Sequence, residues 1–288
     1  MFGIILIDKP QGLTSHGVVS RLRKRFDTRR VGHAGTLDPL ATGLLVIAIG
    51  PATRFLQYLH LEPKEYVCTF TFGAETNTYD SDGEVVSEKP VPSDLETQIK
   101  ETLPQFMGEI EQLPPMYSAV KKDGKPLYAY ARKGEEVERN LRQVVIDEYD
   151  LIRTDENSAR FRIVCSGGTY VRTLAHDLGQ AIGCGAHVTE LRRSRVGKFN
   201  IDEAVTIENA DQEHLIPLAS ALEPMPLVKL NDGQFKLVQN GNFIRVQQSP
   251  NDEYAALTDQ EGNVISVARV VHNELHPECV IPMEALYG

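Results

Sequence analysis

The apolar residues of this chain come in short runs, and the length of these runs limits what the chain can fold into. The longest runs, Phe2–Ile7 and Leu44–Ile49, have six residues each, whereas a helix that spans a bilayer needs about 20. The chain has 288 residues, of which 41% are hydrophobic, so it can bury a sizeable core. We therefore expect a globular protein without membrane spans, built as one large domain with an appendage or as two unequal domains.

The sequence shows no signs of secretion, disulfide bonding or metal binding. Up to Asp8 the N-terminus has neither a cationic region nor a small-residue cleavage site, which predicts a cytoplasmic protein. The four cysteines have no CxxC spacing and the eight histidines include no HExxH pair. These spacings argue against a disulfide framework and against a metal site, so no metal is expected.

The negative charge is concentrated near the C-terminus. The net charge is −10, but residues 201–288 hold 14 acidic and four basic residues, which leaves 26 of each kind in the first 200. Residues 1–60 carry eight basic residues against three acidic ones. A second basic cluster contains Arg192, Arg193, Arg195 and Lys198. Two such clusters are either solvated surface faces or a surface that binds a polyanion such as nucleic acid.

The N-terminal segment predicts a strand, a turn and a helix. Gly3–Asp8 is rich in β-branched and other apolar residues, and the turn after it contains Pro10 and Gly12. Thr14 or Ser15 can cap a basic helix. The residues of this helix that we expect to face inward are Val18, Val19 and Leu22.

A glycine-rich loop then leads into the apolar run Leu44–Ile49. Asp38 lies in this loop and precedes Pro39, which disfavours a helical conformation for it. The carboxylate is therefore predicted on irregular, constrained backbone at the entrance to a strand. Loops that are fixed on a rigid scaffold often carry functional residues, so Asp38 is a candidate for chemistry.

Periodic patterns predict further strands and helices. Apolar residues alternate in Tyr66–Phe72 and again in Phe161–Cys165, as they do in strands. Ser93 and Glu96 have the spacing of a capping box for a helix that ends near Leu103.

A second helix is predicted after the Gly167-Gly168 turn. Its apolar positions are Val171, Leu174, Ala175 and Leu178, and Gly179 is expected just past its end. Arg172 lies off this apolar stripe.

Two segments stand out from the rest of the chain. Residues 113–142 are basic and contain three tyrosines, which predicts a long excursion from the main body. After a proline-containing linker at 223–226, turn signals at 231–233, 240–241 and 261–263 predict hairpins. Residues 227–288 are therefore expected to form a small acidic β domain.

Five blocks of sequence together resemble the TruB-type tRNA pseudouridine synthases, in their bacterial stand-alone form. Gly32–Leu45, which contains Asp38, is similar to the catalytic motif of that family. The other four blocks occur in the family's order and at fitting spacing. They are Asp8–Ser15, Leu113–Lys121, Cys165–Leu174 and Gly183–Arg193. The resemblance covers essentially the whole chain, and its C-terminal part resembles the PUA-like module that ends such enzymes.

The resemblance implies an α+β fold in which helices flank a mixed, largely antiparallel sheet. Residues 1–222 would form the catalytic domain, with the basic excursion at about 113–142, and residues 227–288 a small β-rich PUA-like domain. The implied reaction converts uridine-55 in the T-arm loop of tRNA to pseudouridine, without cofactor or metal. Uracil must be detached from C1′ of its ribose, turned and rejoined through C5. Such a site needs a carboxylate and a pocket for the detached base.

By resemblance, the catalytic residues are Asp38, Tyr66 and Arg172. Asp38 would act as a nucleophile or as the group that stabilises or deprotonates the sugar; as an isolated residue it could equally be a hydrogen-bonding turn residue. Tyr66 would stack on uracil and serve in proton removal, although its alternation with Cys68 also fits a core residue. Arg172 would pair with the catalytic carboxylate and favour its ionised form; the alternative is a solvated helix arginine.

The remaining candidates contact RNA or line the pocket. The target base must be unstacked, and we expect His33 and Leu191 to fill or shape the gap, although His33 could be a turn residue and Leu191 a core residue. Lys9 and Tyr170 are expected as pocket neighbours. Lys121, Arg192 and Arg193 are the candidates for RNA contact.

The resemblance implies tRNA, through its T-arm stem-loop, as the partner, with no membrane and no obligate protein partner, and a monomer is expected. Two other functions remain open. A hydrolase could use the same aspartate and release free uracil, and an RNA chaperone could refold the T-arm. Such a folding role could also accompany the modification.

Overall fold

The structure is a computed structural model that describes residues 1–287, and the chain divides into two compact units. Unit 1 consists of Met1–Asp38, Leu44–Leu61 and the residues from Ile201 onward, and unit 2 consists of Pro39–Gly43 and Glu62–Asn200. Within the described residues, no helix has both the length and the apolar character that crossing a membrane requires.

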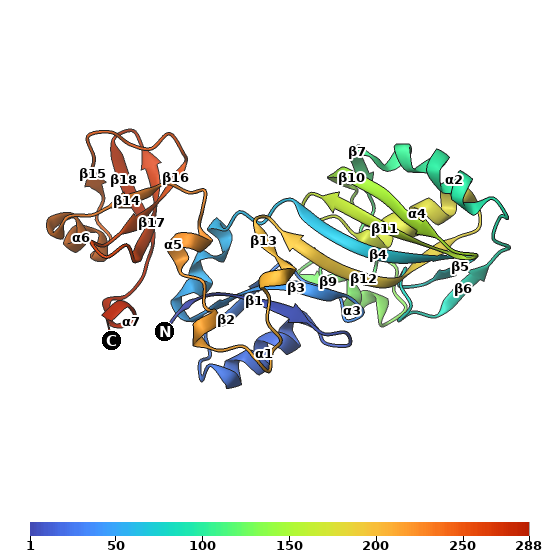
Figure 1. Ribbon diagram of the computed structural model, residues 1–288, viewed down its shortest axis with the longest axis horizontal. Helices are drawn as coiled ribbons and strands as arrows, with labels where there is room; N and C mark the ends of the chain where they lie inside the picture. The colour runs from blue at the N-terminus through green and yellow to red at the C-terminus, as the bar shows by residue number, and fades with distance from the viewer. Residues whose placement is uncertain (288) are drawn as a thin grey trace. The chain divides into compact units, whose positions relative to one another are not determined.

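Unit 2 is organised around an antiparallel run of strands (Figure 1). In spatial order these are β12 (Ala186–Val196), β4 (Lys64–Phe72), β11 (Ser158–Cys165), β10 (Arg142–Thr154) and β7 (Gly108–Gln112). The first residues of β3 (Thr42–Ile49) run parallel to β12, where Thr42 pairs with Arg192. The sheet is therefore mixed but largely antiparallel, and the predicted α+β class is confirmed.

The central strand β4 has the two faces that its sequence predicts. Tyr66, Cys68, Phe70 and Phe72 are buried, and the residues between them are partly exposed. Phe70 packs on Phe161 of β11 with ring centroids 4.7 Å apart, and Phe161 meets Tyr149 of β10 at 5.4 Å. Aromatic contacts of this kind add to the burial of apolar area, so this face of the sheet is the core of unit 2.

Helix α4 (Val171–Ile182) packs against β12 (Figure 1). Its predicted apolar stripe is buried. The prediction that the helix ends before Gly179 is wrong. The helix continues to Ile182, and Gly183, with φ 95°, is the residue that ends it. Gly179 is required inside the helix, because a Cβ there would lie 2.2 Å from the backbone nitrogen of Ala186.

The capping box predicted at Ser93 and Glu96 is also wrong. Asp94 precedes the first turn of α2, and its side chain caps no backbone N–H. The remaining elements of unit 2 are α2 (Leu95–Thr102), η2 (Leu103–Phe106), the hairpins β5 (Ala74–Thr76) with β6 (Val85–Glu88) and β8 (Lys121–Lys122) with β9 (Lys125–Pro126), α3 (Leu127–Ala131) and β13 (Phe199–Asn200). The excursion at 113–142 thus contains the second hairpin and α3.

The N-terminal part of unit 1 follows the predicted strand, turn and helix. Thr14 caps α1 by accepting a hydrogen bond from the Gly17 nitrogen at 2.9 Å, and Val18, Val19 and Leu22 are buried. The elements here are β1 (Gly3–Lys9), α1 (Ser15–Arg25), β2 (Val31–Ala34), which is antiparallel to β3, η1 (Gly50–Tyr58), η3 (Ile201–Glu203), η4 (Gln212–His214) and α5 (Leu218–Ala221).

The C-terminal residues of unit 1 form a separate sheet with its own hydrophobic cluster around Leu257 and Leu275. Its elements are β14 (Leu227–Lys229), α6 (Asp232–Gln239), β15 (Ile244–Arg245), β16 (Tyr254–Thr258), β17 (Val264–Val271), β18 (Glu274–Val280) and α7 (Met283–Tyr287), and its strand order is β14-β16-β17-β18-β15. The turn at 261–263 joins two antiparallel strands as predicted.

The other two hairpins predicted in this region are wrong. Asn231 begins α6, because its side chain accepts from the Gln234 nitrogen while the Gln234 side chain accepts from the Asn231 nitrogen. Asn240 ends the same helix. The asparagines of both turn signals are therefore helix boundaries here, and at Asn231 the reciprocal bonds of a capping box satisfy the first turn.

The close approach of α4 and β12 gives a prediction for stability. Gly179→Ala should lower the free energy of unfolding by about 2 kcal/mol, because the new methyl group would overlap backbone that cannot rotate away. The matched control is Gly233→Ala, a helix glycine whose Cβ would meet only the Asn231 side chain at 3.4 Å. This control should be neutral or more stable by up to about 1 kcal/mol. Equal urea denaturation midpoints for the two variants would contradict the packing described here.

A second prediction concerns Asp177, which lies half-buried on α4. Burial raises the pKa of this carboxyl group from 3.8 to about 6. The folded protein therefore holds this proton more tightly than the unfolded chain, so the stabilisation is complete below about pH 4 and is lost as the pH rises through about 6. The Asp177→Asn side chain stays neutral at every pH. The melting temperature of this variant minus that of wild type should therefore be larger at about pH 8 than at about pH 5. A melting difference that does not change with pH would rule out this titration.

Candidate active site

Asp38 lies half-buried on irregular backbone in unit 1, as the sequence predicts. The preceding residue, Leu37, is fixed by Ser15 in the first turn of α1. The Ser15 hydroxyl donates to the Leu37 carbonyl oxygen at 3.1 Å and accepts from the Leu37 nitrogen at 2.8 Å. Ser15 is itself 2% exposed. Two sequence blocks, Asp8–Ser15 and the one that contains Asp38, therefore meet at one buried hydroxyl.

The sequence did not predict this role of Ser15, which it treats only as a possible helix cap. A hydroxyl that binds both main-chain groups of one residue holds that residue more tightly than a single bond does. Its partner is 22 residues away in the chain, so no local pattern identifies the pair.

Lys9 and His33 also belong to unit 1. Lys9, at the end of β1, is fully buried, and its ammonium group donates to the carbonyl oxygens of Pro10 at 2.9 Å and Leu13 at 2.6 Å. These two bonds close the turn before α1, so Lys9 has a clear structural role. His33 is half-buried on β2, opposite Ile47 of β3. It is therefore a strand residue rather than the turn residue that the sequence left open.

Arg172 lies in the first turn of α4 in unit 2 and is 3% exposed, which rules out a solvated helix arginine. Its Nη1 donates to the Thr78 carbonyl oxygen at 2.9 Å and lies 3.3 Å from the Asp80 carboxylate, and its Nη2 donates to the Tyr117 carbonyl oxygen at 2.8 Å. A planar guanidinium held from these directions has one orientation. Arg172 can therefore present a fixed positive charge.

Asp80 is a site residue that the sequence did not identify. It is 4% exposed, and its Oδ1 accepts from the Thr78 hydroxyl at 2.6 Å and from the Asp82 nitrogen at 3.1 Å. A buried carboxylate needs this many partners because removing a charge from water is costly. In the sequence Asp80 lies in a polar, turn-like stretch. Only its contact with the distant Arg172 identifies it as part of the candidate site.

Tyr66 and Leu191 lie on the buried face of the unit 2 sheet, and each is 7% exposed. Tyr66 pairs with Ile163 on β11 and with Arg193 on β12. Leu191 pairs with Cys68, so the structure puts the two candidates on neighbouring positions of one face. Arg193 is 1% exposed, and its charge therefore faces protein rather than solvent.

The main chain of Tyr170 is fixed by the buried side chain of Gln112. The Tyr170 nitrogen donates to Gln112 Oε1 at 2.9 Å, and Gln112 Nε2 donates back to the Tyr170 carbonyl oxygen at 3.3 Å. Tyr170 directly precedes Val171, the first residue of α4. The same two bonds therefore also fix the start of the helix that carries Arg172.

The excursion at 113–142 presents basic side chains to solvent. Leu127 is buried and anchors α3. The exposed bases around it are Lys121, Lys125, Arg132 and Lys133. A cluster of exposed cations beside tyrosines suits the phosphates and bases of RNA. Lys121 is thus exposed as its predicted role requires.

The second basic cluster predicted from the sequence is only partly exposed. Arg192 and Lys198 are exposed, whereas Arg193 is buried. Arg195 lies 3.8 Å from the Glu65 carboxylate. Of this cluster, Arg192 and Lys198 are therefore the cations that can meet a polyanion.

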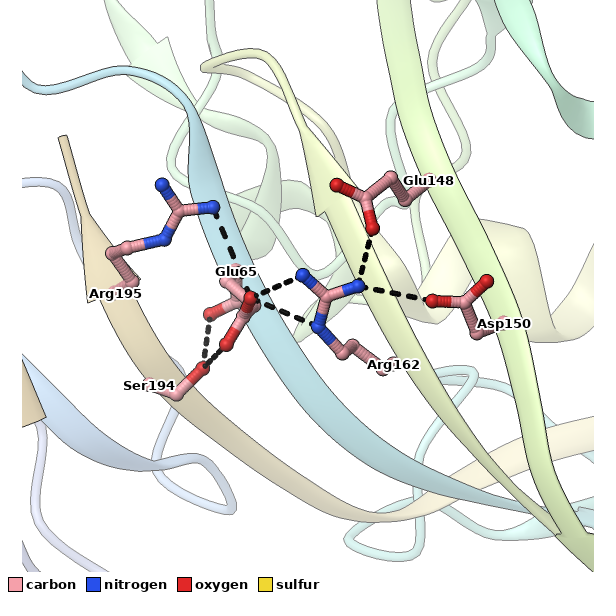
Figure 2. Close-up of polar contacts among 6 residues, drawn as sticks. All are labelled: Glu65, Glu148, Asp150, Arg162, Ser194 and Arg195. Atoms are coloured by element: carbon pink, nitrogen blue, oxygen red, sulfur yellow. Dashed lines mark hydrogen bonds and ion pairs between the residues drawn. The ribbon is translucent and has the colours of Figure 1, made fainter.

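Figure 2 shows Glu65 on β4 between the neighbouring strands β11 and β12. Glu65 contacts Arg162 on β11, and Ser194 and Arg195 on β12. Arg162 also pairs with Glu148 and with Asp150 on β10, the latter at 2.9 Å. Burial acts to raise the pKa of Glu65, but the hydrogen bonds from Ser194 and Arg162 outweigh it and lower this pKa. The network neutralises Arg162 and ties four strands together.

The candidates are thus divided between the units. His33, Lys9 and Asp38 lie in unit 1, and the others, Tyr66, Lys121, Tyr170, Arg172, Leu191, Arg192 and Arg193, lie in unit 2. Among residues 1–287, no group of three or more His, Cys, Asp or Glu side chains could hold a metal ion.

Two family models match the chain in adjoining segments. Residues 23–171 match the N-terminal domain of the TruB family of pseudouridylate synthases. Residues 172–225 match the C-terminal domain of tRNA pseudouridylate synthase B. The first match alone covers more than half of the chain and includes Asp38 and Tyr66.

Curated relatives are similar over most of their length. The chain is 42% identical over 279 residues to tRNA pseudouridine synthase B of Stutzerimonas stutzeri, covering 93% of this chain and 91% of that protein. It is 47% identical over 234 residues to the protein of the same name from Syntrophotalea carbinolica, covering 78% and 76%.

Solved structures show the same fold. A crystal structure of a Cbf5–Nop10–Gar1 complex matches with a TM-score of 0.72 and 27% identity, covering 98% of this chain and 86% of the matched chain. An H/ACA ribonucleoprotein bound to a substrate RNA that contains 2′-deoxyuridine matches with a TM-score of 0.71 and 25% identity, with the same coverage. Together with the family models and the curated relatives, these matches show that the chain belongs to the TruB family of pseudouridine synthases.

Proposed function

We propose that this chain converts uridine-55 in the T-arm loop of tRNA to pseudouridine, with Asp38 as the catalytic carboxylate. The names of the curated relatives supply the substrate class. One observation carries the choice of Asp38, namely that Ser15 binds both main-chain groups of Leu37, the residue before it. Such fixed backbone suits a reacting group, because displacement by about 1 Å can cost about 100-fold in rate.

The reaction breaks the bond between C1′ and N1 and forms a bond between C1′ and C5. N1 gains a proton and C5 loses one, so the composition of the RNA does not change. Asp38 acts at the sugar, either as a nucleophile at C1′ or by stabilising or deprotonating the ribose. Tyr66 stacks on the uracil and takes part in removing the proton from C5.

Arg172 is the proposed charge partner of the catalytic carboxylate. Its buried guanidinium is held by Asp80 and by the carbonyl oxygens of Thr78 and Tyr117. A nearby fixed cation favours the ionised form of a carboxyl group. This orientation supports a role in which Arg172 keeps Asp38 charged without moving during the reaction.

The remaining candidates bind the RNA or shape the pocket. His33 and Leu191 fill the space that the extruded base leaves. Lys9 supports the pocket by binding the main chain of the turn before α1. Tyr170 supports it from a main chain that Gln112 holds in place. Lys121 and Arg192 contact the RNA backbone, as their exposure allows. Because Arg193 is buried, we propose that it supports the pocket beside Tyr66 rather than contacting the outer phosphates.

We further propose that the protein acts as a monomer in the cytoplasm, without an obligate protein partner, and that it can also help tRNA to fold. Light scattering of the purified protein, alone and with tRNA, tests the monomer. Incubation with an isolated T-arm hairpin tests the reaction. Pseudouridine at unchanged RNA mass supports an isomerase, free uracil would indicate a hydrolase, and refolding without either product would indicate a chaperone alone.

Asp38→Asn should lower pseudouridine formation by at least about a thousandfold, because it removes the charge but keeps the shape. Binding of tRNA should stay within about threefold of wild type, because phosphate and shape contacts supply the affinity. The control is Asp252→Asn, at an exposed carboxylate in the C-terminal part, which should retain the wild-type rate. Substantial product from the Asp38 variant would remove this residue from the mechanism.

The salt dependence of binding should arise from the first 200 residues. Lys121→Gln should reduce the slope of log K against log salt by about 0.7 to 0.9, the value for one lost phosphate contact. Arg245→Gln should change this slope little, because Arg245 lies 3.1 Å from the Glu274 carboxylate in the acidic C-terminal domain. Binding titrations of the full-length variants at several salt concentrations measure these slopes. A larger loss of slope for the Arg245 variant than for the Lys121 variant would place the RNA-binding surface on the C-terminal domain.

A further inference from the structure

The turn that supports Arg172 has an unfavourable backbone at its centre. Thr78 and Asp80 both contact the arginine, and Tyr79 between them has φ 64°. This left-handed conformation is unfavourable for a residue with a Cβ, and glycine or asparagine adopts it most readily. A tyrosine in this place therefore indicates a side-chain contact that a smaller residue would not make.

The Tyr79 ring makes such a contact with α4. It stacks on the His176 ring, with centroids 4.0 Å apart and planes 14° apart. His176 lies four residues after Arg172, so the two side chains project from the same face of α4. The turn at 78–80 therefore meets the helix at two points one helical turn apart, the guanidinium and the imidazole.

The His176 side chain contributes a ring rather than a charge. Burial lowers the pKa of His176 from its usual 6.5, although Glu75 acts in the opposite direction, so the imidazole is uncharged in neutral solution. Its Nδ1 lies 3.9 Å from the Glu75 carboxylate, too far for a hydrogen bond, and has no hydrogen-bond partner among residues 1–287. The stack with Tyr79 is therefore the contact through which His176 supports the turn.

Main-chain bonds attach the same turn to β12 rather than to α4. The Tyr79 carbonyl oxygen accepts from the Val188 nitrogen at 3.0 Å, and the Ser81 nitrogen donates to the Val188 carbonyl oxygen at 2.9 Å. A single contact with α4, through the guanidinium, would let the turn tilt against the helix. The second contact, through the rings, removes this freedom, so the stack fixes how the turn approaches Arg172.

We propose that Tyr79 and His176 form a pair of positioning residues whose stacked rings orient Arg172. The rings hold the turn at 78–80 against α4, so that a carbonyl oxygen and a carboxylate of the turn reach the guanidinium from fixed directions. This orientation is built into the free protein and needs no bound RNA. The inference rests on the proposed function, because the pair acts on the rate of that reaction through Arg172.

The test removes each ring in turn and then restores one of them. His176→Ala removes the imidazole, and Tyr79→Gly removes the phenol ring while it relieves the unfavourable backbone. In single-turnover reactions at saturating tRNA, each variant should be slower than wild type by about tenfold, because misplacement of a group in the site lowers rate rather than affinity. His176→Phe keeps an uncharged ring and should stay within about threefold of the wild-type rate.

A double variant and a matched control separate the stack from general effects on stability. The combination of His176→Ala with Tyr79→Gly should be no slower than the slower single variant, because both changes remove the same contact. The control, His276→Ala, removes a comparable stack on Phe243 in the C-terminal sheet, where the centroids are 5.1 Å apart and the planes 19° apart. It should keep the wild-type rate, and all variants should bind tRNA within about threefold of wild type.

Two results would overturn the positioning role. One is a rate for His176→Phe as low as that for His176→Ala, and the other is a multiplied rate loss in the double variant. Melting temperatures identify any variant that is not folded. If His176→Ala is such a variant, Tyr79→Gly with His176→Phe decides the question.

The outcome also distinguishes this inference from the proposed function. If the wild-type protein forms no pseudouridine from a T-arm substrate, the proposed function fails and this inference fails with it. If the wild type is active and His176→Ala and Tyr79→Gly convert bound tRNA at the wild-type rate, the function stands and the role of the stacked rings is wrong.

Discussion

The burial of Arg172 is the constraint on which the candidate site depends. A guanidinium keeps its charge at any relevant pH, so a protein that buries one must surround it with acceptors or lose several kcal/mol. Here Asp80 supplies the opposite charge, and the carbonyl oxygens of Thr78 and Tyr117 supply further acceptors. Two segments far from α4 in the sequence, 78–80 and the one that contains Tyr117, are thereby fixed around one side chain, and Tyr79 within the first of them has a left-handed backbone.

The loop that carries Asp38 is fixed through its backbone at Leu37. Ser15 binds the main chain of Leu37 from the first turn of α1, and Thr14 caps that turn. Helix and loop are therefore held by two adjacent hydroxyl residues. Backbone that is fixed beside Asp38 defines the position of this candidate reacting group, as catalysis requires.

The sequence predicted the features that local patterns determine. Side chains alternate strictly along a strand, so the buried face of β4 could be read directly. The predicted end of α4 was wrong because Gly179 serves contact with β12, and a glycine needed for packing looks like a glycine that ends a helix. Asn231 was misassigned although its partner is local. Asn231 and Gln234 have the spacing of a capping box, but the run Asn-Asp-Gly is also a common hairpin turn. For the candidate site, the blocks proposed Asp38 and Arg172, whereas Asp80 and Ser15 make contacts with distant residues that no local spacing identifies.

Tyr66 shows why a catalytic candidate could resemble a core residue. On β4 it shares a face with Lys64, Cys68 and Phe70, and the character of this face changes along the strand. Towards Phe70 the partners across the sheet are apolar, whereas Tyr66 pairs with the buried Arg193. Burial and the nearby Arg193 charge lower the pKa of Lys64. The Glu62 carboxylate acts on this pKa in the opposite direction. Tyr66 therefore lies where an apolar face gives way to charged groups, and the alternation of its strand alone does not distinguish a core tyrosine from one that borders a site.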